Sequence, residues 1–457
     1  MPPSSKAQYI PKPGRSEREL VEEHRGKDGK FEDPDFRAEG PSLFIGGEVP
    51  EGHIPLDMVE WLRPSQFVPR LTEGKSPQLF VDGAEAGDVI QGALGDCWFL
   101  SALCTVASRK DLLRNLFAST EHASQGIYTI RFFKNGRWKY VNIDDRIPCG
   151  PTGQPLYARA KEPHEIWPML LEKAYAKLNG RCYRNLETGT MGFALKDMTG
   201  GEPLTVNLVD PQIRDECENG FLWQKLKLWV KQGSLMGCSY SVRRGEPREV
   251  EYDGGIIRGH AYSMLDVREF KHLRFLKIRN PWGKKEWTGR WADFGPEWEN
   301  LRENYSDAPD WMVNYRSDND GTFWMLFEDF CKYFNMIYVC IHFPHSWSEE
   351  VIRGRWSTAT NSGGCPDRKN EWWLNPMYKI SVSTRTQLFI SMCQTDMRCY
   401  GNKDEHKQHD TMWNKYQNAI GFVVTTEPAV AKCKRLFDSG ETNLRQADMI
   451  ARGFPFR

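Results

Sequence analysis

The sequence predicts a mixed α+β protein whose core has two subdomains with a cleft between them, followed by an antiparallel β-sandwich. Three observations carry this prediction. A helix-bearing half covers residues 31–200, a strand-rich half covers residues 201–344, and short β runs separated by polar loops occupy residues 345–457. The chain of 457 residues is long enough for two or three domains, each with a core of its own.

The N-terminal part is expected to add little to these cores. Residues 1–30 are polar, with several prolines and then mixed charge, and this composition predicts a flexible lead. Residues 31–69 are also rich in proline, but they hold apolar anchors such as Phe36, Trp61 and Phe67. They predict an extended strap that lies on the domain that follows.

Two patterns predict the regular structure of the first subdomain. Residues 126–143 contain two β-rich runs around the pair Asn135 and Gly136, which is a strong hairpin signal. Residues 165–178 have apolar side chains four positions apart, with Pro168 in the first turn, and predict an amphipathic helix.

The second half is expected to be dominated by strands. After a short helix over residues 221–231, strand-like runs occur around Gly237 and over residues 261–265, 274–279 and 323–327. After residue 344, three short β runs over residues 372–382, 387–392 and 419–424 predict the antiparallel sandwich.

Composition excludes several classes of function. Lysine plus arginine and aspartate plus glutamate are equal at 61 each, so no basic field argues for a nucleic-acid partner or a membrane surface. The 12 cysteines form no Cys-x-x-Cys pair, and the start of the chain is no secretory signal. We therefore expect reduced thiols and a cytoplasmic location. No apolar run approaches the roughly 18 residues of a spanning helix, so no transmembrane segment is expected.

Cys97 is the first candidate for chemistry. Gly92 and Gly95 predict a bend, Asp96 is a good N-cap residue, and no helix breaker occurs from Cys97 to beyond Ala107. Unpaired N–H groups at a helix N-terminus favour thiolate over thiol. The side-chain amide of Gln91, just upstream, would suit a donor for an oxyanion beside this nucleophile. A cysteine in an apolar helix is more often a small buried residue, so a reactive role requires a partner.

Two candidate partners lie in the second half. His260 follows a glycine and opens a strand-like run, while Asn280 ends another such run before a Pro-Trp-Gly corner. Adjacent strands would place His260 and Asn280 side by side, with Cys97 approaching from elsewhere in the fold. A thiolate–imidazolium pair oriented by an amide is the Cys-His-Asn version of the catalytic triad. Either polar residue alone is more simply explained as structural.

Taken together, these segments resemble the calpain cysteine proteases. The resemblance rests on residues 91–98 (QGALGDCW), 259–262 (GHAY) and 279–283 (RNPWG), in the order of that family, and it extends from about Phe31 to about Glu427. It implies a papain-like protease core with an interdomain cleft, the β-sandwich domain of calpains, and calcium-regulated cysteine protease activity.

The resemblance also implies roles for the candidate residues. Cys97 would be the nucleophile, and His260 the general base and then the acid toward the leaving amine. Asn280 would orient the imidazole, and Trp282 would shield that hydrogen bond from water. The side chain of Gln91 and the backbone N–H of Cys97 would form the oxyanion hole.

Calcium is the cofactor that the resemblance implies, with one ion in each protease subdomain. Residues 81–88 form an acidic loop with glycines, and hard oxygen ligands of this kind suit calcium. Carried over by resemblance, the first site would use the carbonyls of Val81 and Gly83 and the carboxylates of Asp88 and Glu165. The second site would use Glu286, Asp293, the carbonyl of Asp318, and Asp320.

The sequence departs from the family in several places. Thr322 stands where the family usually has glutamate, and Ala86 replaces an arginine that pairs with that glutamate, so the second calcium site lacks a carboxylate. No acidic loop occurs between Val382 and Leu388, and the chain ends at Arg457, so a shortened sandwich is expected. No EF-hand loop spacing occurs, so the family's heterodimerisation through such a tail is not expected.

Two hypotheses of function follow. The first is a calcium-regulated intracellular cysteine endopeptidase that makes limited cuts in protein substrates, with calcium bringing the two half-sites together. The alternative is a non-catalytic scaffold or adaptor that keeps the fold to bind partners. The intact set of five active-site residues favours the endopeptidase, whereas the altered second calcium site and the shortened sandwich favour the scaffold. Regulatory partners of the calpain type are compatible with both.

Overall fold

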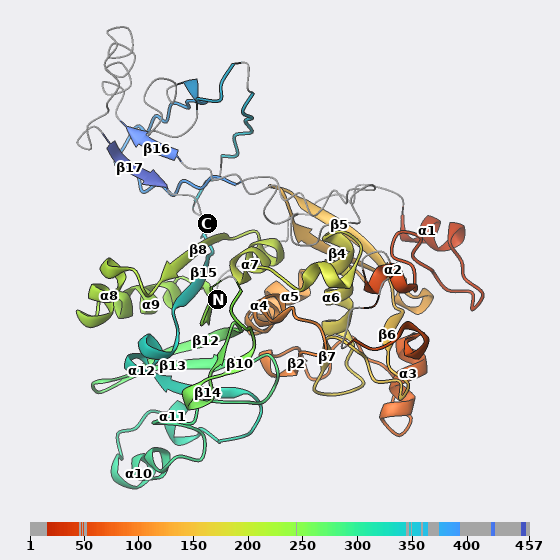
Figure 1. The fold of residues 1–457 in the computed structure, drawn as a ribbon, viewed down its shortest axis with the longest axis horizontal. Helices are drawn as coiled ribbons and strands as arrows, with labels where there is room; N and C mark the ends of the chain where they lie inside the picture. The colour runs from red at the N-terminus through yellow and green to blue at the C-terminus, as the bar shows by residue number, and fades with distance from the viewer. Residues whose placement is uncertain are drawn as a thin grey trace. The chain divides into compact units, whose positions relative to one another are not determined.

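The computed structural model divides the chain into two compact units (Figure 1). The first comprises residues 1–346 and 398–406, and the second comprises residues 347–397 and 407–457. The residues that the structure describes are 16–44, 47, 49, 53–243, 245–343, 347–348, 350–357, 360–363, 374–393, 422–425 and 449–453. Within those residues, every helix is too short or too polar to cross a bilayer.

Part of the expected flexible lead is structured. Ser16 caps helix α1 (Glu17–Glu23): its hydroxyl accepts a hydrogen bond from the N–H of Glu19, whose carboxylate accepts one from the N–H of Ser16. Val21 on this helix is buried in a small apolar cluster. The predicted flexible lead is therefore wrong for residues 16–30, because a capping box and a buried valine stabilise them. The residues before Ser16 lie outside the described part of the chain.

The first half of unit one surrounds helix α4 (Cys97–Ala107). Its 11 residues lack glycine and proline and are mostly apolar on every side, and all of them are buried. The other elements of this half are α2 (Gly40–Leu43), η2 (Leu56–Met58), β1 (Glu60–Leu62), α3 (Pro64–Leu71), η3 (Ala86–Asp88), β2 (Val89–Ile90), α5 (Lys110–Arg114), β3 (Phe117–Ser119), η4 (Ala123–Gln125), β4 (Ile127–Phe133), β5 (Trp138–Asp144), β6 (Ile147–Cys149), β7 (Arg159–Ala160), α6 (Trp167–Leu178), η5 (Tyr183–Leu186) and α7 (Met191–Thr199). Their apolar side chains form one large core cluster.

The two elements predicted for this half are confirmed. Strands β4 and β5 pair in antiparallel register, and the turn residues Asn135 and Gly136 have φ angles of 55° and 72°. Positive φ at both positions is what a tight hairpin turn requires. Helix α6 begins at Trp167 and has Pro168 in its first turn.

The second half of unit one is an antiparallel six-stranded sheet with the strand order β14-β13-β12-β9-β15-β8 (Figure 1). Its strands are β8 (Glu202–Asn207), β9 (Leu235–Ser239), β12 (Ala261–Phe270), β13 (Leu273–Arg279), β14 (Thr322–Leu326) and β15 (Met336–Ile341). The remaining elements are α8 (Pro211–Glu218), α9 (Phe221–Lys231), β10 (Val250–Glu251), η6 (Asp253–Gly255), β11 (Ile257–Arg258), α10 (Pro296–Asn304), α11 (Asp310–Val313) and α12 (Phe327–Tyr333). Two further apolar clusters form most of the core here, and Leu235, Ala261, Tyr338 and Cys340 join the large cluster of the first half.

Helix α4 packs against this sheet through hydrogen bonds as well as apolar contacts. The hydroxyl of Ser101 donates to the carbonyl of Ala261 at 2.8 Å, and the hydroxyl of Ser263 donates back to the carbonyl of Ser101 at 2.7 Å. From strand β13, Arg279 donates to the sulfur of Cys104 at 3.2 Å. The helix that begins at Cys97 is thus held on the two strands that adjoin His260 and Asn280.

The described part of the second unit contains one pair of strands. Strands β16 (Phe422–Thr425) and β17 (Met449–Gly453) are antiparallel, and β16 overlaps the predicted run over residues 419–424. No strand occurs within the described residues 374–393, so the predicted runs at 372–382 and 387–392 are wrong as far as they are described. Apolar side chains there, including Ile380 and Leu388, are about half exposed.

A buried ion-pair cluster ties the N-terminal segment to the first half. The guanidinium of Arg63, which precedes α3, pairs with the buried carboxylate of Asp145 and, at 2.5 Å, with the half-exposed carboxylate of Asp28. It also donates to the carbonyl of Phe31 at 3.0 Å. Removing one member of a buried ion pair lowers stability strongly, because the charge of its partner stays buried without compensation. This loss is larger than the net stabilisation that the pair itself provides.

We therefore expect Arg63→Met to lower the free energy of unfolding by about 3–5 kcal/mol, since it leaves the Asp145 carboxylate without its cation. Urea unfolding followed by tryptophan fluorescence measures this change. The matched control is Arg70→Met, because the pair of Arg70 with Glu60 is about half exposed on both sides. The control should change stability by less than about 1 kcal/mol. Equal effects of the two substitutions would contradict the role of the buried cluster.

Candidate active site

A glycine-containing loop places Cys97 at the first position of helix α4. A Cβ at Gly92 would lie 2.2 Å from the carbonyl oxygen of Tyr157, so this close approach requires glycine. Asp96 occupies the N-cap position as predicted, but its side chain makes no capping hydrogen bond. The Cys97 side chain is nearly buried, with the residue 8% exposed. The thiol therefore sits at the N-terminal end of the helix, where the helix dipole favours negative charge.

His260 and Asn280 lie side by side, as adjacent strands predict. His260 directly precedes β12, Asn280 directly follows β13, and these strands pair in antiparallel register. Nε2 of His260 is 2.9 Å from Oδ1 of Asn280, and both residues are fully buried. The carboxamide is fixed in turn, because its nitrogen donates to the carbonyl of Lys285 at 3.0 Å.

Trp282 covers the imidazole. Its ring centroid lies 4.6 Å from that of His260, and its backbone N–H donates to Oδ1 of Asn280 at 3.0 Å. The indole is thus in position to exclude water from the hydrogen bond between His260 and Asn280, which is the place that the resemblance implied for it.

The structure brings Cys97 and His260 together, although they belong to different halves. A ring nitrogen of His260, the sulfur of Cys97 and a carboxylate oxygen of Glu249 all lie within 4.8 Å of one another. Burial of the ring disfavours the imidazolium, whereas Cys97, Glu249 and Asn280 favour it, and the net result raises the pKa of His260 to about 9. The ring is therefore protonated at neutral pH, as a thiolate–imidazolium pair requires.

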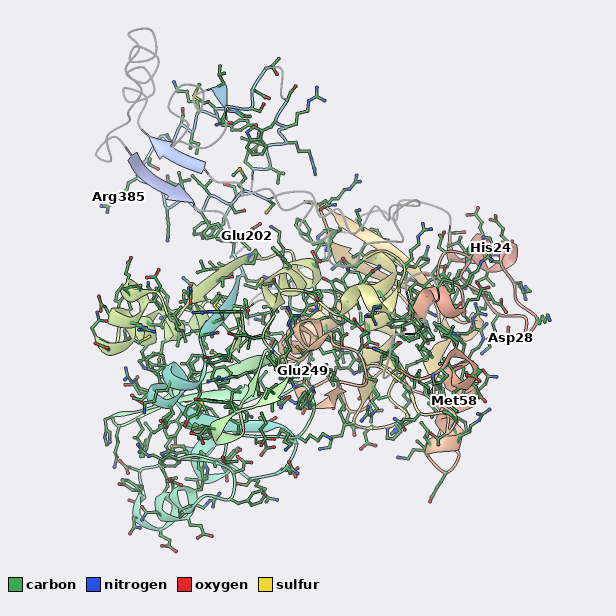
Figure 2. All side chains as sticks on the ribbon, in the orientation of Figure 1. His24, Asp28, Met58, Glu202, Glu249 and Arg385 are labelled. Carbon is green, nitrogen blue, oxygen red and sulfur yellow. The ribbon has the colours of Figure 1, made fainter. Side chains whose placement is uncertain are left out.

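Glu249 was not expected at this site. Its Oε1 lies 3.5 Å from Nδ1 of His260, and its place in the fold is marked in Figure 2. The residue precedes strand β10 by one position and lies in a loop without a recognised motif, so no signal in the sequence indicated it.

Gln91 is anchored between the two halves. Its backbone N–H donates to the carbonyl of Pro281 at 2.9 Å, and its side-chain nitrogen donates to the carbonyl of Leu94 at 2.8 Å. An amide nitrogen has two hydrogens, so one is still available for an oxyanion. The hydrogen bond to Leu94 thus holds the side-chain amide of Gln91 within the loop that leads into α4.

Asp96 forms a buried pair with Glu172 of helix α6. Burial raises the pKa of Asp96 to about 8, although its hydrogen bond with Glu172 lowers that pKa. Burial and the neighbouring Asp96 raise the pKa of Glu172 well above its usual range. Both oxygens of Glu172 accept from the N–H of Ala158, at 3.0 and 3.1 Å. The residue next to the nucleophile is thus a neutral acid at neutral pH, and the sequence indicated it only as a helix cap.

The residues assigned to the first calcium site adjoin one another. Oε1 of Glu165 accepts from the N–H of Val81 at 2.9 Å, and Asp88 accepts from the N–H of Glu85 at 2.6 Å. Gly83 has a φ of 88°, which glycine adopts without strain. Burial and the nearby Asp88 raise the pKa of Glu165 to about 7, and burial also raises the pKa of Asp88. A cation would stabilise both carboxylates, so these residues fit calcium.

The residues assigned to the second calcium site also gather. Glu286 accepts from the N–H of Gly321 at 2.6 Å, and Asp293 accepts from the N–H of Asp318 at 3.1 Å. Burial and the neighbouring Asp293 and Asp320 raise the pKa of Glu286 to about 7. Oδ1 of Asp320 accepts from the N–H of Thr322 at 2.8 Å. Thr322 adds no carboxylate to this group, so Glu286, Asp293 and Asp320 are the acidic side chains that would face an ion.

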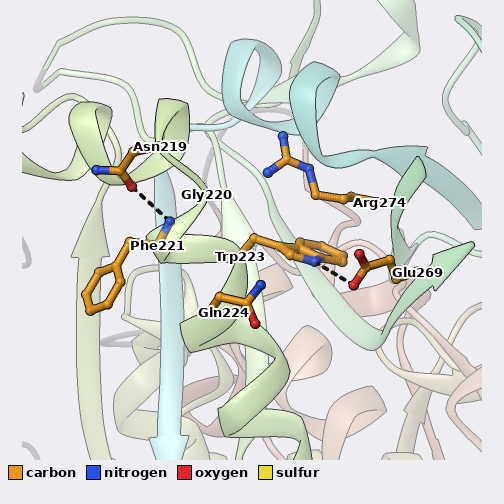
Figure 3. A pocket seen from close by; sticks show the side chains of 7 residues that line it. All are labelled: Asn219, Gly220, Phe221, Trp223, Gln224, Glu269 and Arg274. Atoms are coloured by element: carbon orange, nitrogen blue, oxygen red, sulfur yellow. Dashed lines mark hydrogen bonds between the residues drawn. The ribbon is translucent and has the colours of Figure 1, made fainter. Parts of the chain in front are cut away.

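A separate pocket lies in the second half of unit one. It has a volume of about 530 Å³, and Figure 3 shows the indole of Trp223 donating to Glu269 within it. Its walls are formed by Asn219, Gly220, Phe221, Trp223, Gln224, Glu269 and Arg274. None of these residues belongs to the candidate active site, and Arg274 is already paired with Glu328.

A thiol on one half and a carboxamide-bound imidazole on a sheet of the other half define the papain-like class of cysteine peptidases. Comparison with known proteins then identifies the family. The sequence model described as calpain family cysteine protease matches residues 31–341, and that of calpain large subunit, domain III, matches residues 352–448. The chain therefore belongs to the calpain family of cysteine proteases, with a calpain protease core followed by the calpain β-sandwich domain.

Similar proteins come from plants and mammals. The calpain-type cysteine protease DEK1 of Zea mays is 37% identical over 79% of this chain and 16% of its own length. Calpain-8 of Mus musculus is 34% identical over 77% of this chain and 49% of its own, and calpain-9 of Homo sapiens is 32% identical over 84% and 55%. The chain thus spans about half the length of the two mammalian relatives and much less of the plant relative.

The buried acid pair gives a prediction of pH-dependent stability. The pKa of Asp96 is about 8 in the folded protein, against 3.8 for an unperturbed aspartate. Its contribution to the free energy of unfolding is therefore fully present below pH 3.8 and is lost as the pH rises through about 8.

We expect Asp96→Asn, which stays neutral, to lose less stability than the wild type between about pH 5 and pH 8. Urea unfolding at several pH values measures the difference. Asp111→Asn is the control, because Asp111 is exposed and paired with Arg109 on the surface. If D96N and the wild type lose stability in parallel, Asp96 is ionised in the folded protein and the argument fails.

Proposed function

We propose that this protein is a calcium-regulated cysteine endopeptidase that makes limited cuts in protein substrates. The observation that carries the proposal is the approach of the Cys97 sulfur, a ring nitrogen of His260 and a carboxylate oxygen of Glu249 to within 4.8 Å of one another. Asn280 holds the other ring nitrogen of His260, which is the arrangement that thiol acyl transfer requires.

The chemistry follows from the positions of the donors and acceptors. His260 holds the proton released by Cys97, and the thiolate attacks the carbonyl carbon of the scissile peptide. The N–H of Cys97 and the amide of Gln91 donate to the oxyanion that forms. His260 then gives its proton to the leaving amine, and a water molecule, deprotonated by the same imidazole, releases the acyl group. Asn280 keeps the imidazole oriented through both proton transfers.

Calcium would be held by the two acidic groups of residues described above. The first ion would take the carboxylates of Asp88 and Glu165 with carbonyls of the loop over residues 81–88, and the second would take Glu286, Asp293 and Asp320 with the carbonyl of Asp318. Bound calcium would supply positive charge that keeps these carboxylates ionised.

Arg279 offers a physical link between the first ion and the active site. Its guanidinium donates to the carbonyl of Gly87 at 2.9 Å, inside the proposed calcium loop, and to the sulfur of Cys104 on helix α4. The next residue in the chain is Asn280, which orients the imidazole. Ordering of the loop by calcium would therefore be transmitted to both the nucleophile helix and the strand end that carries Asn280.

Digestion of casein by the purified chain tests the function. We expect cleavage by the wild type in calcium and none in a calcium chelator. Cys97→Ala should lower kcat by about 10⁶-fold, as loss of a nucleophile does in a triad enzyme. Cys393→Ser is the matched control, because Cys393 is an exposed thiol of the second unit, and it should retain full activity.

Asn280→Ala provides a second arm of the same test. It should lower kcat by about 10²–10⁴-fold with little change in KM, because Asn280 acts on the proton carrier and not on substrate binding. Equal digestion by C97A and the wild type would overturn the proposal and leave the scaffold hypothesis.

Direct calcium binding tests the first ion site. In calorimetric titrations of C97A, which cannot digest itself, Glu165→Gln should weaken one binding event by about tenfold or more, because it removes a ligand charge. Because the pKa of Glu165 is about 7 without calcium, protons compete below that pH, and affinity should fall as the pH drops through about 7. Glu162→Gln is the control, because Glu162 is half exposed beside His164. Identical binding by the two variants would exclude Glu165 as a ligand.

A further inference from the structure

The cluster of Cys97, Glu249 and His260 has the composition of a metal site. Among the described residues, it is the single group of three or more His, Cys, Asp or Glu side chains whose potential ligand atoms all lie within 4.8 Å of one another. It combines a sulfur, an imidazole nitrogen and a carboxylate oxygen. Thiolate and imidazole with a carboxylate are the donors that Zn²⁺ takes in proteins.

The imidazole is oriented as a metal ligand would be. Nε2 of His260 is bound to Oδ1 of Asn280, an acceptor, so Nε2 carries a hydrogen. When the ring is neutral, Nδ1 then has a free lone pair. Nδ1 is buried and makes no hydrogen bond to any described residue, although it lies 3.5 Å from Glu249. A carbonyl that fixes the far nitrogen of the ring is the usual support of a zinc-bound histidine.

Glu249 is held beside the ring by the fold of its segment. A Cβ at Gly259, which directly precedes His260, would lie 2.9 Å from Cα of Arg248, so the two segments are in close backbone contact. Arg258 also stacks on the rings of Tyr240 and Tyr252, and Tyr252 belongs to the segment that carries Glu249. The Glu249 side chain is itself 36% exposed, so it can move toward an ion without disturbing a core.

The separations between the three potential ligand atoms are close to those of a zinc site. Zinc bonds of about 2.0–2.3 Å in a tetrahedron place neighbouring ligand atoms roughly 3.3–3.8 Å apart. The separation of 3.5 Å between Nδ1 of His260 and Oε1 of Glu249 already falls in this range. The remaining separations, which are at most 4.8 Å, require a contraction of at most about 1.5 Å.

We propose that Cys97, His260 and Glu249 form a zinc site that inhibits the protein reversibly, with water at the fourth position. Zinc would displace the one proton that the thiolate–imidazolium pair holds, and it would occupy the lone pairs of sulfur and nitrogen that peptide cleavage uses. The inhibition rests on the proposed peptidase function, whereas the binding of the metal does not. The proposed site differs from an ordinary thiol–imidazole pair because Glu249 supplies a third ligand.

Cobalt(II) tests the site without any activity measurement, because a thiolate bound to tetrahedral Co²⁺ absorbs strongly in the near ultraviolet. The titration uses the full chain in the Cys217→Ser background, since the adjacent thiols of Cys217 and Cys331 would otherwise offer a second pair of sulfur ligands. We expect about one Co²⁺ per chain, released on addition of Zn²⁺. Added to the wild type in calcium, the same Zn²⁺ should stop casein digestion, and a chelator selective for zinc should restore it.

Substitutions then assign the ligands. Cys97→Ser should abolish the thiolate absorption, and Glu249→Gln should weaken Co²⁺ binding by about tenfold or more. Glu251→Gln, on the same segment but paired with Lys285, is the matched control and should bind as the parent does. Asn280→Ala should weaken binding by about 10–100-fold, the usual cost of losing a group that orients a ligand.

The outcomes separate this proposal from the proposed function. Absorption that persists in C97S, or equal binding by E249Q and E251Q, would overturn the zinc site even if casein is digested normally. Co²⁺ binding that follows the expected order in a chain that never digests casein would support the zinc site and overturn the peptidase. A wild type that digests casein equally with and without Zn²⁺ would overturn the inhibition.

Discussion

Helix α4 is seated on the six-stranded sheet by reciprocal hydroxyl–carbonyl hydrogen bonds between Ser101, Ala261 and Ser263, and the approach of Cys97 to His260 depends on that contact. The helix begins at Cys97, and the strand it touches begins one residue after His260. A shift of the helix along the sheet would therefore separate the sulfur from the ring. Because the bonded groups are buried, each bond that is broken leaves polar atoms without partners, and the contact resists such a shift.

Ionisable groups are concentrated around this contact. Asp96 and Glu172 are buried next to the nucleophile, Arg279 crosses from the sheet to the helix and to the loop over residues 81–88, and the partly exposed Glu249 lies beside the imidazole. Asp96, Glu172 and Arg279 are costly to bury alone, so each restricts where its neighbours can lie. The same property makes the site responsive to cations: calcium would stabilise the acidic loops, and zinc would take the donors that the reaction uses.

Much of the fold and part of the site could be predicted from the sequence. The hairpin turn at Asn135 and Gly136, the helix beginning near Pro168 and the start of α4 at Cys97 follow from chemistry that acts within a few residues. The pairing of His260 with Asn280 could be predicted because both stand at the ends of neighbouring strand-like runs. The strands predicted in residues 374–393 were wrong, because a run of apolar residues records a local preference and does not by itself form a strand.

By itself, the sequence determined the order of the three motifs, the family they belong to and the local elements that carry them, because turns, caps and periodicity are properties of short segments. Only the tertiary structure decided that Glu249 faces His260, that Asp96 shares a buried site with Glu172, and that Ser101 is bonded to a residue 160 positions away. These contacts join segments that no local pattern relates. They form because packing two cores together brings those side chains out of water at the same place.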